Sequence, residues 1–262
     1  MNIVVCIKRV PDTAESEVKI DSTGKDIVKE GLAFNINEAD NYALEEALLI
    51  KEEMGGTVTL VTMGTEKAEE TIKMGLAKGA DKAVRLDDPA FAESDGEVTA
   101  RILASAIKDM EYDLVLTGCI ATDNWYSQVG PALAEMLGIP HANMVTKEEI
   151  KDKKVHAFRE LEGGLLEKLE IGLPAVLSIQ TGINEQRYAS IMGIAKASKK
   201  EIELKGMNDL GLKEEQVGAK GSKTSIEKLE LPVQEKMAEL ISGAPEEAAE
   251  KLSGILKERG VV

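Results

Sequence analysis

Polar, small and aromatic residues gather in residues 117–131, which read TGCIATDNWYSQVGP. This segment follows an apolar run and leads into a predicted helix, whose N-terminus offers unpaired N–H groups and a positive partial charge. A phosphate bound there gains about 0.3–1 kcal/mol from the helix dipole. We expect Ser127 or Asn124 to cap this helix or to bind phosphate oxygens, and Trp125 and Tyr126 to cover a ring or to pack within the loop. An ordinary capped loop is the alternative, and the residues themselves leave both interpretations open.

Three further segments carry polar residues at predicted strand ends or just before a predicted helix, namely residues 6–12, 35–38 and 62–65. In a doubly wound sheet, ligands bind beyond the C-terminal ends of the strands, where the strand order reverses. We therefore expect the four segments to meet there, and the residues alone leave open whether they form a nucleotide site or ordinary loops. The chain has neither a G-x-G-x-x-G motif nor a Walker lysine motif, so the usual dinucleotide fingerprint and the ATPase loop are excluded.

Other kinds of site find little support in the residues. His141 follows Pro140 and His156 lies in a predicted exposed hairpin, so both are expected to be structural or solvated rather than partners of a nucleophile. The two histidines also lack metal-ligand spacing, and a zinc site is not expected. Cys6 and Cys119 lie near predicted strand ends, where we expect small apolar packing rather than a redox pair.

The composition of the chain argues against several classes of binding partner. The chain has 262 residues, a formal net charge of −15 and only 3% aromatic residues. Such a chain repels a phosphate backbone and has few rings to stack on bases, so no nucleic-acid partner is expected. No apolar run reaches the ~18 residues of a membrane span, and the first residues lack the features of a secretory signal. Two cysteines without a disulfide framework favour the reducing cytoplasm.

Apolar runs alternate with amphipathic segments through the first two thirds of the chain. The predicted strands cover residues 3–7, 57–62, 83–86, 113–117 and 175–179, and the predicted helices cover residues 37–54, 66–78, 96–110 and 128–137. This alternation indicates crossover connections and a parallel sheet, and strands that are apolar throughout are buried on both faces. The expected fold class is α/β, a Rossmann-like, mostly parallel, doubly wound sheet.

Two inserted hairpins interrupt the alternation. The first pairs residues 18–20 with residues 27–29 around an Asp-Ser-Thr-Gly turn. The second pairs residues 155–161 with residues 165–171 across a Gly-Gly turn.

The character of the chain changes near residue 200. Residues 201–230 are rich in Lys and Glu and are interpreted as an extended linker, followed by short helices near residues 232–240 and 245–257. We therefore divide the chain into a nucleotide-binding domain, residues 1–200, and a C-terminal arm, residues 201–262. The arm either packs on a partner subunit or returns to its own domain.

Several separate motifs occur together along nearly the whole chain. The opening reads VCIKRVPDT and then EVKID, the first predicted helix contains YALEEA, and the second contains ETI followed by AKGAD. The fourth helix is entered through SQVGP, and later segments read RELEGG, LPAV and NEQRYAS. Together these motifs resemble those of the β subunit of electron-transfer flavoprotein.

The resemblance implies a heterodimer with an α subunit that holds an FAD, and electron transfer between a flavin-dependent dehydrogenase and other acceptors. In the common form the β subunit binds AMP, whereas in the electron-bifurcating form it binds a second FAD that NADH reduces. Residues 10–13 (VPDT), 121–123 (ATD) and 128–131 (QVGP) look more like the bifurcating form. We therefore expect FAD here rather than AMP, with electrons divided between a dehydrogenase and a low-potential acceptor such as ferredoxin.

The resemblance also carries over site residues, position by position. The implied nucleotide contacts are Cys6, Asn37, Glu38, Ala39, Asp40, Met63, Gly118, Cys119, Ile120, Ala121, Thr122, Asp123, Asn124, Trp125, Tyr126, Ser127, Gln128 and Val129. The chain departs from the family where Glu38 replaces a common proline and where Trp125 and Tyr126 replace small residues. No catalytic side chain is implied, so the chain is expected to be an electron carrier whose hydride chemistry belongs to the flavin.

A second surface follows from the same resemblance. Ile191 stands where the family docks on dehydrogenases through an aliphatic residue, and we expect it to form an exposed apolar tip with Tyr188. Exposed apolar tips usually mark docking surfaces.

Two other functions remain open at this stage. A non-bifurcating β subunit would bind a structural AMP, and a ligand specific for the folded state stabilises it by about 2.7 kcal/mol at one hundred times its dissociation constant. A stand-alone nucleotide-binding stress protein would use the same loops as a monomer. Residues 159–162 and the C-terminal arm argue against the monomer, because an arm suits a partner.

Overall fold

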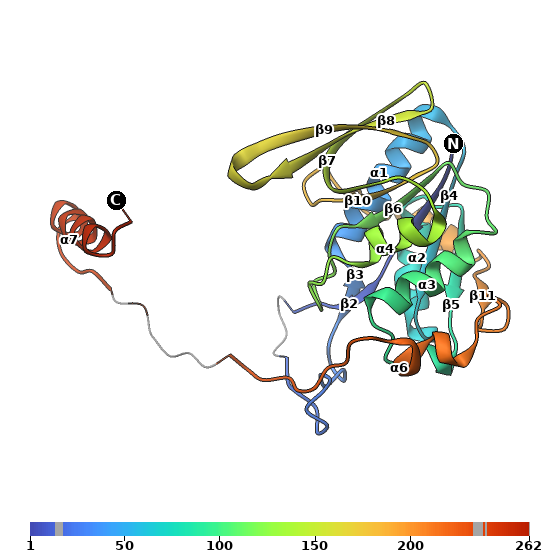
Figure 1. Cartoon of the computed structure of the whole chain (residues 1–262), viewed down its shortest axis with the longest axis horizontal. Helices are drawn as coiled ribbons and strands as arrows, with labels where there is room; N and C mark the ends of the chain where they lie inside the picture. The colour runs from blue at the N-terminus through green and yellow to red at the C-terminus, as the bar shows by residue number, and fades with distance from the viewer. Residues whose placement is uncertain (14–17, 233–237, 239, 262) are drawn as a thin grey trace.

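The computed structural model describes residues 1–13, 18–232, 238 and 240–261. Within them, a nine-stranded sheet has the order β11-β5-β4-β1-β6-β10-β7-β8-β9 and carries helices on both faces (Figure 1). Its strands are β1 (Asn2–Cys6), β4 (Thr57–Met63), β5 (Lys82–Leu86), β6 (Leu114–Gly118), β7 (His141–Lys151), β8 (Lys154–Leu161), β9 (Leu165–Gly172), β10 (Ala175–Ile179) and β11 (Glu203–Lys205). The helices are α1 (Glu38–Met54), α2 (Glu69–Lys78), α3 (Gly96–Ile107), α4 (Val129–Leu137), α5 (Ile191–Ala197), α6 (Gly218–Gly221) and α7 (Pro245–Glu258).

The expected α/β class is confirmed, because the central strands pair in parallel. Helices α1 and α2 pack on one face, where Leu44, Leu48 and Ile72 are buried, and α3 and α4 pack on the other with Ile102 and Leu133. Strands covered on both faces read as apolar throughout, which made them easy to predict. The predicted strands and helices of the alternating region all exist, with ends that differ by at most three residues.

The strand order reverses at the centre of the sheet. β1 pairs with β4 on one side and with β6 on the other. The chain therefore builds β1, β4 and β5 outward in one direction, then returns to place β6 and β10 on the opposite side. At such a reversal the connections diverge beyond the strand ends and leave a crevice. The site segments of the sequence analysis were predicted to meet there.

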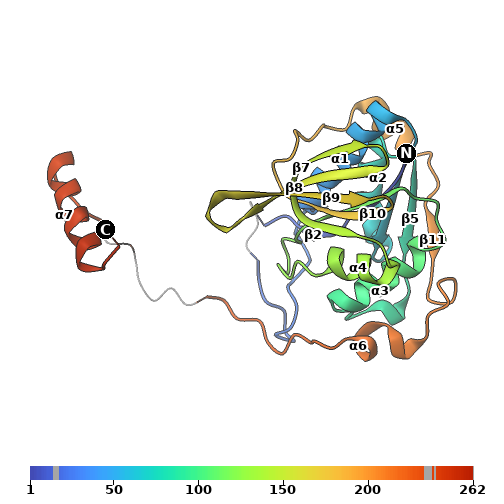
Figure 2. The same cartoon turned by 45° about the horizontal axis from the view of Figure 1, so that its top comes forward.

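The second predicted hairpin is confirmed, but it extends the main sheet instead of standing apart. β8 pairs antiparallel with β7 and with β9, and the β8–β9 ribbon projects beyond the helices (Figure 2). β7 itself was not predicted. Only its residues Ala142 and Val145 are buried, and it is mostly polar, so no continuous apolar run marked it.

The first predicted hairpin is wrong in part. Residues 18–29 contain a single bridge between Ile20 and Ile27 rather than two strands. The chain instead forms an unpredicted two-stranded ribbon from β2 (Arg9–Pro11) and β3 (Phe34–Ile36). Each of these strands has only three residues, too few to show a pattern in the sequence. The ribbon delivers the chain directly to the start of α1.

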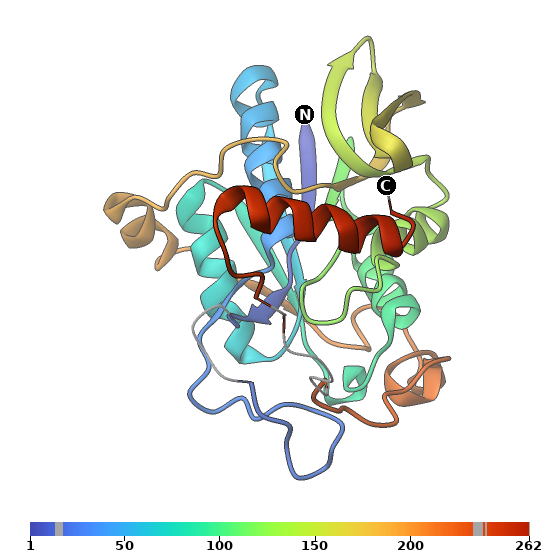
Figure 3. The ribbon, with the colours of Figure 1, turned by 90° about the vertical axis from the view of Figure 1, so that its left-hand side faces the viewer.

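The C-terminal region begins on the domain and then leaves it. β11 pairs in parallel with β5, and Leu210 and Val217 join the apolar core beneath α3, so the first part of the predicted linker packs on its own domain. The helix predicted near residues 232–240 lies largely outside the described residues. α7 agrees closely with the helix predicted at residues 245–257 and has no buried residue. It lies apart from the sheet in Figure 1 and in front of the domain in the turned view of Figure 3.

Candidate functional site

The start of α1 ties together the chain segments that follow β1 and β6. Asp40 is buried, and its carboxylate accepts hydrogen bonds from the backbone amides of Lys8 (2.7 Å) and Gly118 (3.0 Å). Position 118 requires glycine, because a Cβ there would lie 2.4 Å from Oδ1 of Asp40. Asp40 thereby fixes the positions of two backbone segments at the point where the strand order reverses.

Asn37, the residue before α1, holds the long loop after β6. Its side chain is fully buried, donates to the carbonyl oxygen of Ile120 (2.8 Å) and accepts from the amide of Thr122 (3.0 Å). The segments 35–38 and 117–131 therefore meet, as the sequence predicted. An asparagine is well suited to this task, because one amide supplies both a donor and an acceptor.

The loop between β6 and α4 is also tied within itself and to the segment after β1. The Ser127 hydroxyl donates to the carbonyl oxygen of Cys119 (2.6 Å), and the Trp125 indole donates to a carbonyl oxygen inside the loop (3.0 Å). Nζ of Lys8 forms an ion pair with the Asp123 carboxylate (2.6 Å). Lys8 was missing from the predicted site residues. Its position directly after a strand end, four residues before Asp12, was the signal available in the sequence.

The N-terminus of α4 is open. Gln128 precedes the helix without a side-chain cap, and the first turn carries no acidic side chain. Among the described residues, none accepts a hydrogen bond from the amides of Val129 or Gly130, and Pro131 has no amide hydrogen. Gly130 lets the helix approach the sheet closely, because a Cβ would lie 2.0 Å from Oγ of Ser178.

The expectation that Ser127 or Asn124 caps this helix is wrong. The Ser127 hydroxyl is committed to the carbonyl oxygen of Cys119, and Oδ1 of Asn124 lies 3.4 Å from the amide of Tyr126. Both side chains stabilise the loop instead. The first amides of α4 therefore have no side-chain acceptor among the described residues.

Burial controls the protonation of the groups around this site. Burial raises the pKa of Asp40 to about 7, although the hydrogen bonds that it accepts act in the opposite direction. Burial also raises the pKa of the Cys119 thiol to about 11 and that of Cys6 further still, with Asp40 adding to both. Both cysteines are free and stay protonated at neutral pH, and the Cys119 thiol donates to Oε1 of Gln180 (2.8 Å). Protonated, buried thiols are poor nucleophiles, which agrees with a packing role.

The other predicted site residues lie at the same end of the sheet. Cys6 and Met63 are the last residues of β1 and β4, and Gly118 is the last residue of β6. Trp125 and Tyr126 are 67% and 53% exposed, so neither ring packs within the loop as one interpretation held. The structure therefore brings the predicted residues to a single region without assigning a ligand to them.

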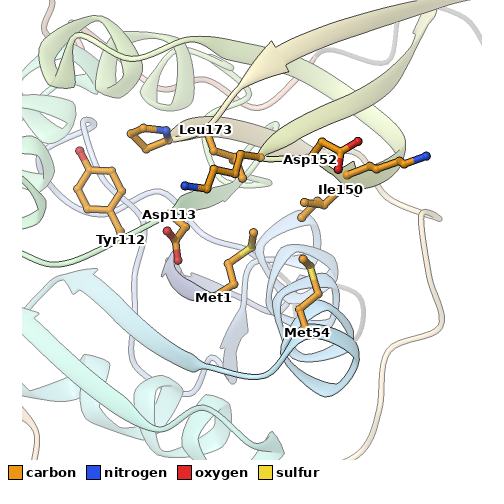
Figure 4. A pocket seen from close by; sticks show the side chains of 10 residues that line it. Met1, Met54, Tyr112, Asp113, Ile150, Asp152 and Leu173 are labelled. Carbon is orange, nitrogen blue, oxygen red and sulfur yellow. The ribbon is translucent and has the colours of Figure 1, made fainter.

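A pocket of about 560 Å³ lies at the opposite end of the strands (Figure 4). It is lined by Met1, Met54, Tyr112, Asp113 and Leu173, among others, and by none of the predicted site residues. It lies where β1 and β6 begin.

Across the described ranges, no group of His, Cys, Asp and Glu residues could hold a metal ion. No helix there has the length and apolar character needed to span a membrane.

The histidines occupy structural settings. Nε2 of His141 lies 3.4 Å from Oγ of Ser178, which accepts a hydrogen bond from Thr117 (3.0 Å) within the buried sheet. Burial lowers the pKa of His141, so its ring is neutral near pH 7. His156 pairs across the β8–β9 ribbon near Glu170.

A separate exposed tip precedes and includes α5. Tyr188 is 97% exposed and Ile191 is 88% exposed. The chain just before them is fixed to α1, because the Arg187 guanidinium forms a bidentate ion pair with the buried carboxylate of Glu45 (2.8–3.0 Å). The tip is thus held by a rigid anchor that the sequence did not reveal.

Comparisons with known proteins agree with this geometry. The electron transfer flavoprotein domain matches residues 25–206. The chain is 41% identical to the electron transfer flavoprotein subunit beta of Thermoanaerobacterium thermosaccharolyticum and 40% identical to that of Bacillus subtilis, with all of both chains covered in each comparison. It is 38% identical, again over the full length of both chains, to the caffeyl-CoA reductase-Etf complex subunit CarD of Acetobacterium woodii.

The matched region contains β3 to β11. It therefore includes the contacts of Asn37 with Ile120 and Thr122, the contact of Asp40 with Gly118, and the uncapped N-terminus of α4. The full-length relatives extend the match to the Lys8 segment and to the C-terminal arm. This chain therefore belongs to the electron transfer flavoprotein family, as a beta subunit.

Proposed function

We propose that this chain binds FAD where β1, β4 and β6 end, and that it takes part in flavin-based electron bifurcation together with an α subunit. One observation carries the proposal, the N-terminus of α4. Its first turn has neither a side-chain cap nor an acidic residue, and it lies where the strand order reverses. Such a helix end attracts a phosphate group.

The residues present fit the pyrophosphate of FAD. The amides of Val129 and Gly130 would donate to its oxygens, and the positive end of α4 would favour its charge. Asn37 and Asp40 hold the neighbouring backbone in place through short hydrogen bonds to the loop after β6. A site whose donors are already fixed loses less entropy when it binds its ligand.

FAD is preferred to AMP on the chain's resemblance to the bifurcating form. A single phosphate would meet the same amides, so α4 alone does not separate the two nucleotides. The motifs VPDT, ATD and QVGP support FAD. A full-length relative that is named as part of a caffeyl-CoA reductase-Etf complex points in the same direction.

The chemistry that a flavin supplies here is acceptance of a hydride from NADH and release of electrons to a dehydrogenase and to a low-potential acceptor such as ferredoxin. The chain's own residues orient the cofactor. Nothing in this scheme requires a side-chain acid or base, and the thiols of Cys6 and Cys119 keep their protons. The chain acts as an electron carrier, and any NADH-oxidising activity is that of the flavin.

The α subunit is the partner we infer for the C-terminal arm. Leu231, Leu240 and Leu252 are 67%, 88% and 48% exposed, and α7 has no buried residue. Apolar side chains left uncovered along one extended segment indicate an interface. We place the complex in the cytoplasm, where free thiols such as Cys6 and Cys119 persist.

We infer that the tip formed by Tyr188 and Ile191 docks on the flavin-dependent dehydrogenase. Replacing Ile191 with Ala removes an exposed apolar contact, and an interface contact of about 1.4 kcal/mol is worth about tenfold in affinity. We expect the KM for the dehydrogenase to rise about tenfold with an unchanged nucleotide content. Leu204→Ala, an exposed apolar residue on β11, is the control. Equal kinetics for Ile191→Ala and wild type would contradict docking at this tip.

Purifying the α/β complex and identifying its released nucleotides tests the cofactor. Two FAD molecules per heterodimer, with NADH oxidation that depends on ferredoxin, would support the proposal. One FAD and one AMP, without that activity, would replace it with the non-bifurcating form. A stable monomer with a nucleotide of its own would support a stand-alone binding protein instead.

A further inference from the structure

The segment that carries the exposed tip is attached to α1 before it reaches Tyr188. Asn184 donates from Nδ2 to Oε2 of Glu46 (2.7 Å) and to a backbone carbonyl oxygen of the same helix (3.1 Å). Gln186 accepts a hydrogen bond from the side chain of Asn41, also on α1. These contacts hold the beginning of the segment, but they lie two or more residues before the tip.

Arg187 makes the last contact before the tip, and both its side chain and its backbone take part. Its Nε and Nη2 donate to Oε1 of Glu45 (3.0 and 2.8 Å), and Nε also reaches Oε2 (2.9 Å). The backbone amide of Arg187 donates to the same Oε2 (3.0 Å). A planar guanidinium that meets a carboxylate at both oxygens fixes the direction of the contact as well as its distance. One buried carboxylate, 4% exposed, therefore sets the backbone of the residue next to Tyr188.

The chain is fixed again directly after the tip. Oγ of Ser190 accepts from the amide of Gly193 (3.0 Å) and caps α5. At Gly193, α5 lies so close to α2 that a Cβ would be 2.2 Å from the carbonyl oxygen of Ala77. Tyr188 and Ile191 thus lie on a backbone that is held on both sides, although their own side chains are 97% and 88% exposed.

Holding a backbone still around exposed apolar side chains gains no burial in the free protein. It does lower the entropy that is lost when a partner covers those side chains. The arrangement around the tip is therefore one that favours binding rather than folding.

We propose that Arg187 and Glu45 are positioning residues for the dehydrogenase, because they hold the tip in its binding conformation before the partner arrives. The inference rests on the docking role proposed above for the tip. Glu45 is buried and cannot reach a partner, so it acts through Arg187. Loss of the pair leaves the contacts of Asn184 and Gln186 in place. The segment then stays on α1, and only the tip loses its fixed direction.

Arg187 also meets a second carboxylate, which provides a matched control. Nη1 of Arg187 donates to Oε1 of Glu52 (2.5 Å), whose side chain is 59% exposed. An exposed single contact contributes little. Glu52→Gln therefore changes the same chemical group on the same helix and the same partner, without touching the buried pair.

Hydrogen exchange in the purified α/β complex, without a dehydrogenase, tests whether the pair holds the tip. Arg187→Lys keeps a positive charge beside Glu45 but loses the planar fork. We expect amide protection in residues 187–194 to fall about tenfold, the factor that one hydrogen bond to a charged group is worth. Glu52→Gln should stay within about twofold of the wild type. Unchanged protection in Arg187→Lys would overturn the positioning role.

A second variant guards against a folding defect. Glu45→Gln keeps the shape of the side chain, but it removes the charge and one of the two acceptor oxygens. It should lower protection in the same residues, 187–194. In both variants, protection in the central strands β1 and β6 should match the wild type. A loss of protection spread over the whole sheet would show a general defect and would contradict a local positioning role.

Steady-state kinetics test whether the pair matters for docking. We expect Arg187→Lys and Glu45→Gln each to raise the KM for the dehydrogenase about tenfold with an unchanged kcat. If the pair acts through the tip, Arg187→Lys should add less than about twofold to the KM once Ile191→Ala is present, because residues that act as one unit are not additive. Two full and independent effects, or a lower kcat at an unchanged KM, would contradict the proposal.

The positioning role and the docking role fail in different ways. If Ile191→Ala raises the KM and Arg187→Lys does not, the positioning role fails and the docking role stands. If Ile191→Ala has normal kinetics, the docking role fails, and the positioning role fails with it whatever the exchange experiment shows.

Discussion

Helices α3 and α4 pack on the same face of the sheet and begin side by side, yet their N-termini differ. Asp95 caps α3 by accepting from the amide of Val98 (2.9 Å), and its other oxygen accepts from the amide of Lys223 (2.8 Å). The α4 N-terminus has no side-chain cap. The two ends are so close that a Cβ on Gly96, the first residue of α3, would lie 3.0 Å from Oε1 of Gln128.

The difference separates a helix end that a side chain caps from one that no side chain caps, where we propose that the nucleotide binds. A side-chain cap contributes about 1 kcal/mol to stability, and at α3 the capping Asp95 also holds the C-terminal arm at Lys223 and Thr224. At α4 that contribution is forgone, and the nearby side chains of Asn37 and Asp40 stabilise the loop instead of the helix end. A helix N-terminus whose neighbouring loop is fixed, and whose first amides remain unpaired, can donate hydrogen bonds to an anion.

Asp40→Asn should have the largest effect of the three variants, because it disrupts the hydrogen bonds that fix the backbone beside α4 at Lys8 and Gly118. An asparagine has one side-chain oxygen, so it cannot accept from both the Lys8 and Gly118 amides, and a buried group left unpaired costs about 1–3 kcal/mol. We expect that loss in the free energy of unfolding, measured by denaturant titration, together with a weaker hold on the nucleotide. Asp113→Asn, at the opposite end of the sheet, is the control and should cost less because its carboxylate is exposed to solvent.

The same variant has a pH signature. Because burial raises the folded-state pKa of Asp40 from 3.8 to about 7, the folded state holds a proton that the unfolded chain has lost between these values. Wild-type stability should therefore fall as the pH rises through this range, and Asp40→Asn should lack that slope. The stability gap between the two proteins should be wider near pH 5 than near pH 8. A constant gap would show that Asp40 is ionised throughout.

Gln128→Glu should have an intermediate effect, because it places a carboxylate where α4 is open. A charge at a partly buried helix terminus is worth about 2 kcal/mol, which corresponds to about a 30-fold loss of nucleotide affinity. The nucleotide released per complex after dialysis measures it. Gln128→Met has a similar shape without charge and should retain the nucleotide. Equal retention by both variants would move the phosphate away from α4.

Asp95→Ala should have the smallest effect and should act on stability alone. We expect a loss of about 1 kcal/mol, the usual value of an N-cap, with an unchanged nucleotide content, because the Lys223 and Thr224 groups that also donate to Asp95 are exposed and can bond to water instead. Thermal unfolding of the complex and its nucleotide content are the two measurements. Loss of nucleotide in this variant would mean that the two helix ends are not independent.

The central strands and their helices could be predicted because burial on both faces leaves an unbroken apolar record, as in residues 175–179. β7 and β11 could not, since β7 is mostly polar without a regular pattern and β11 has only three residues. The meeting of residues 6–12, 35–38 and 117–131 could be predicted, because parallel strands end at the same edge of the sheet. The contacts of Asn37 with Ile120 and Thr122 join residues more than 80 apart, and no local pattern encodes them.

The most direct test of the central claim is the nucleotide content of the purified α/β complex, compared between wild type and Gln128→Glu. The proposal requires two FAD molecules per heterodimer in the wild type and loss of one of them in the variant. A wild-type complex with a single FAD and no second nucleotide would contradict the binding site at α4, and so would a variant that keeps both.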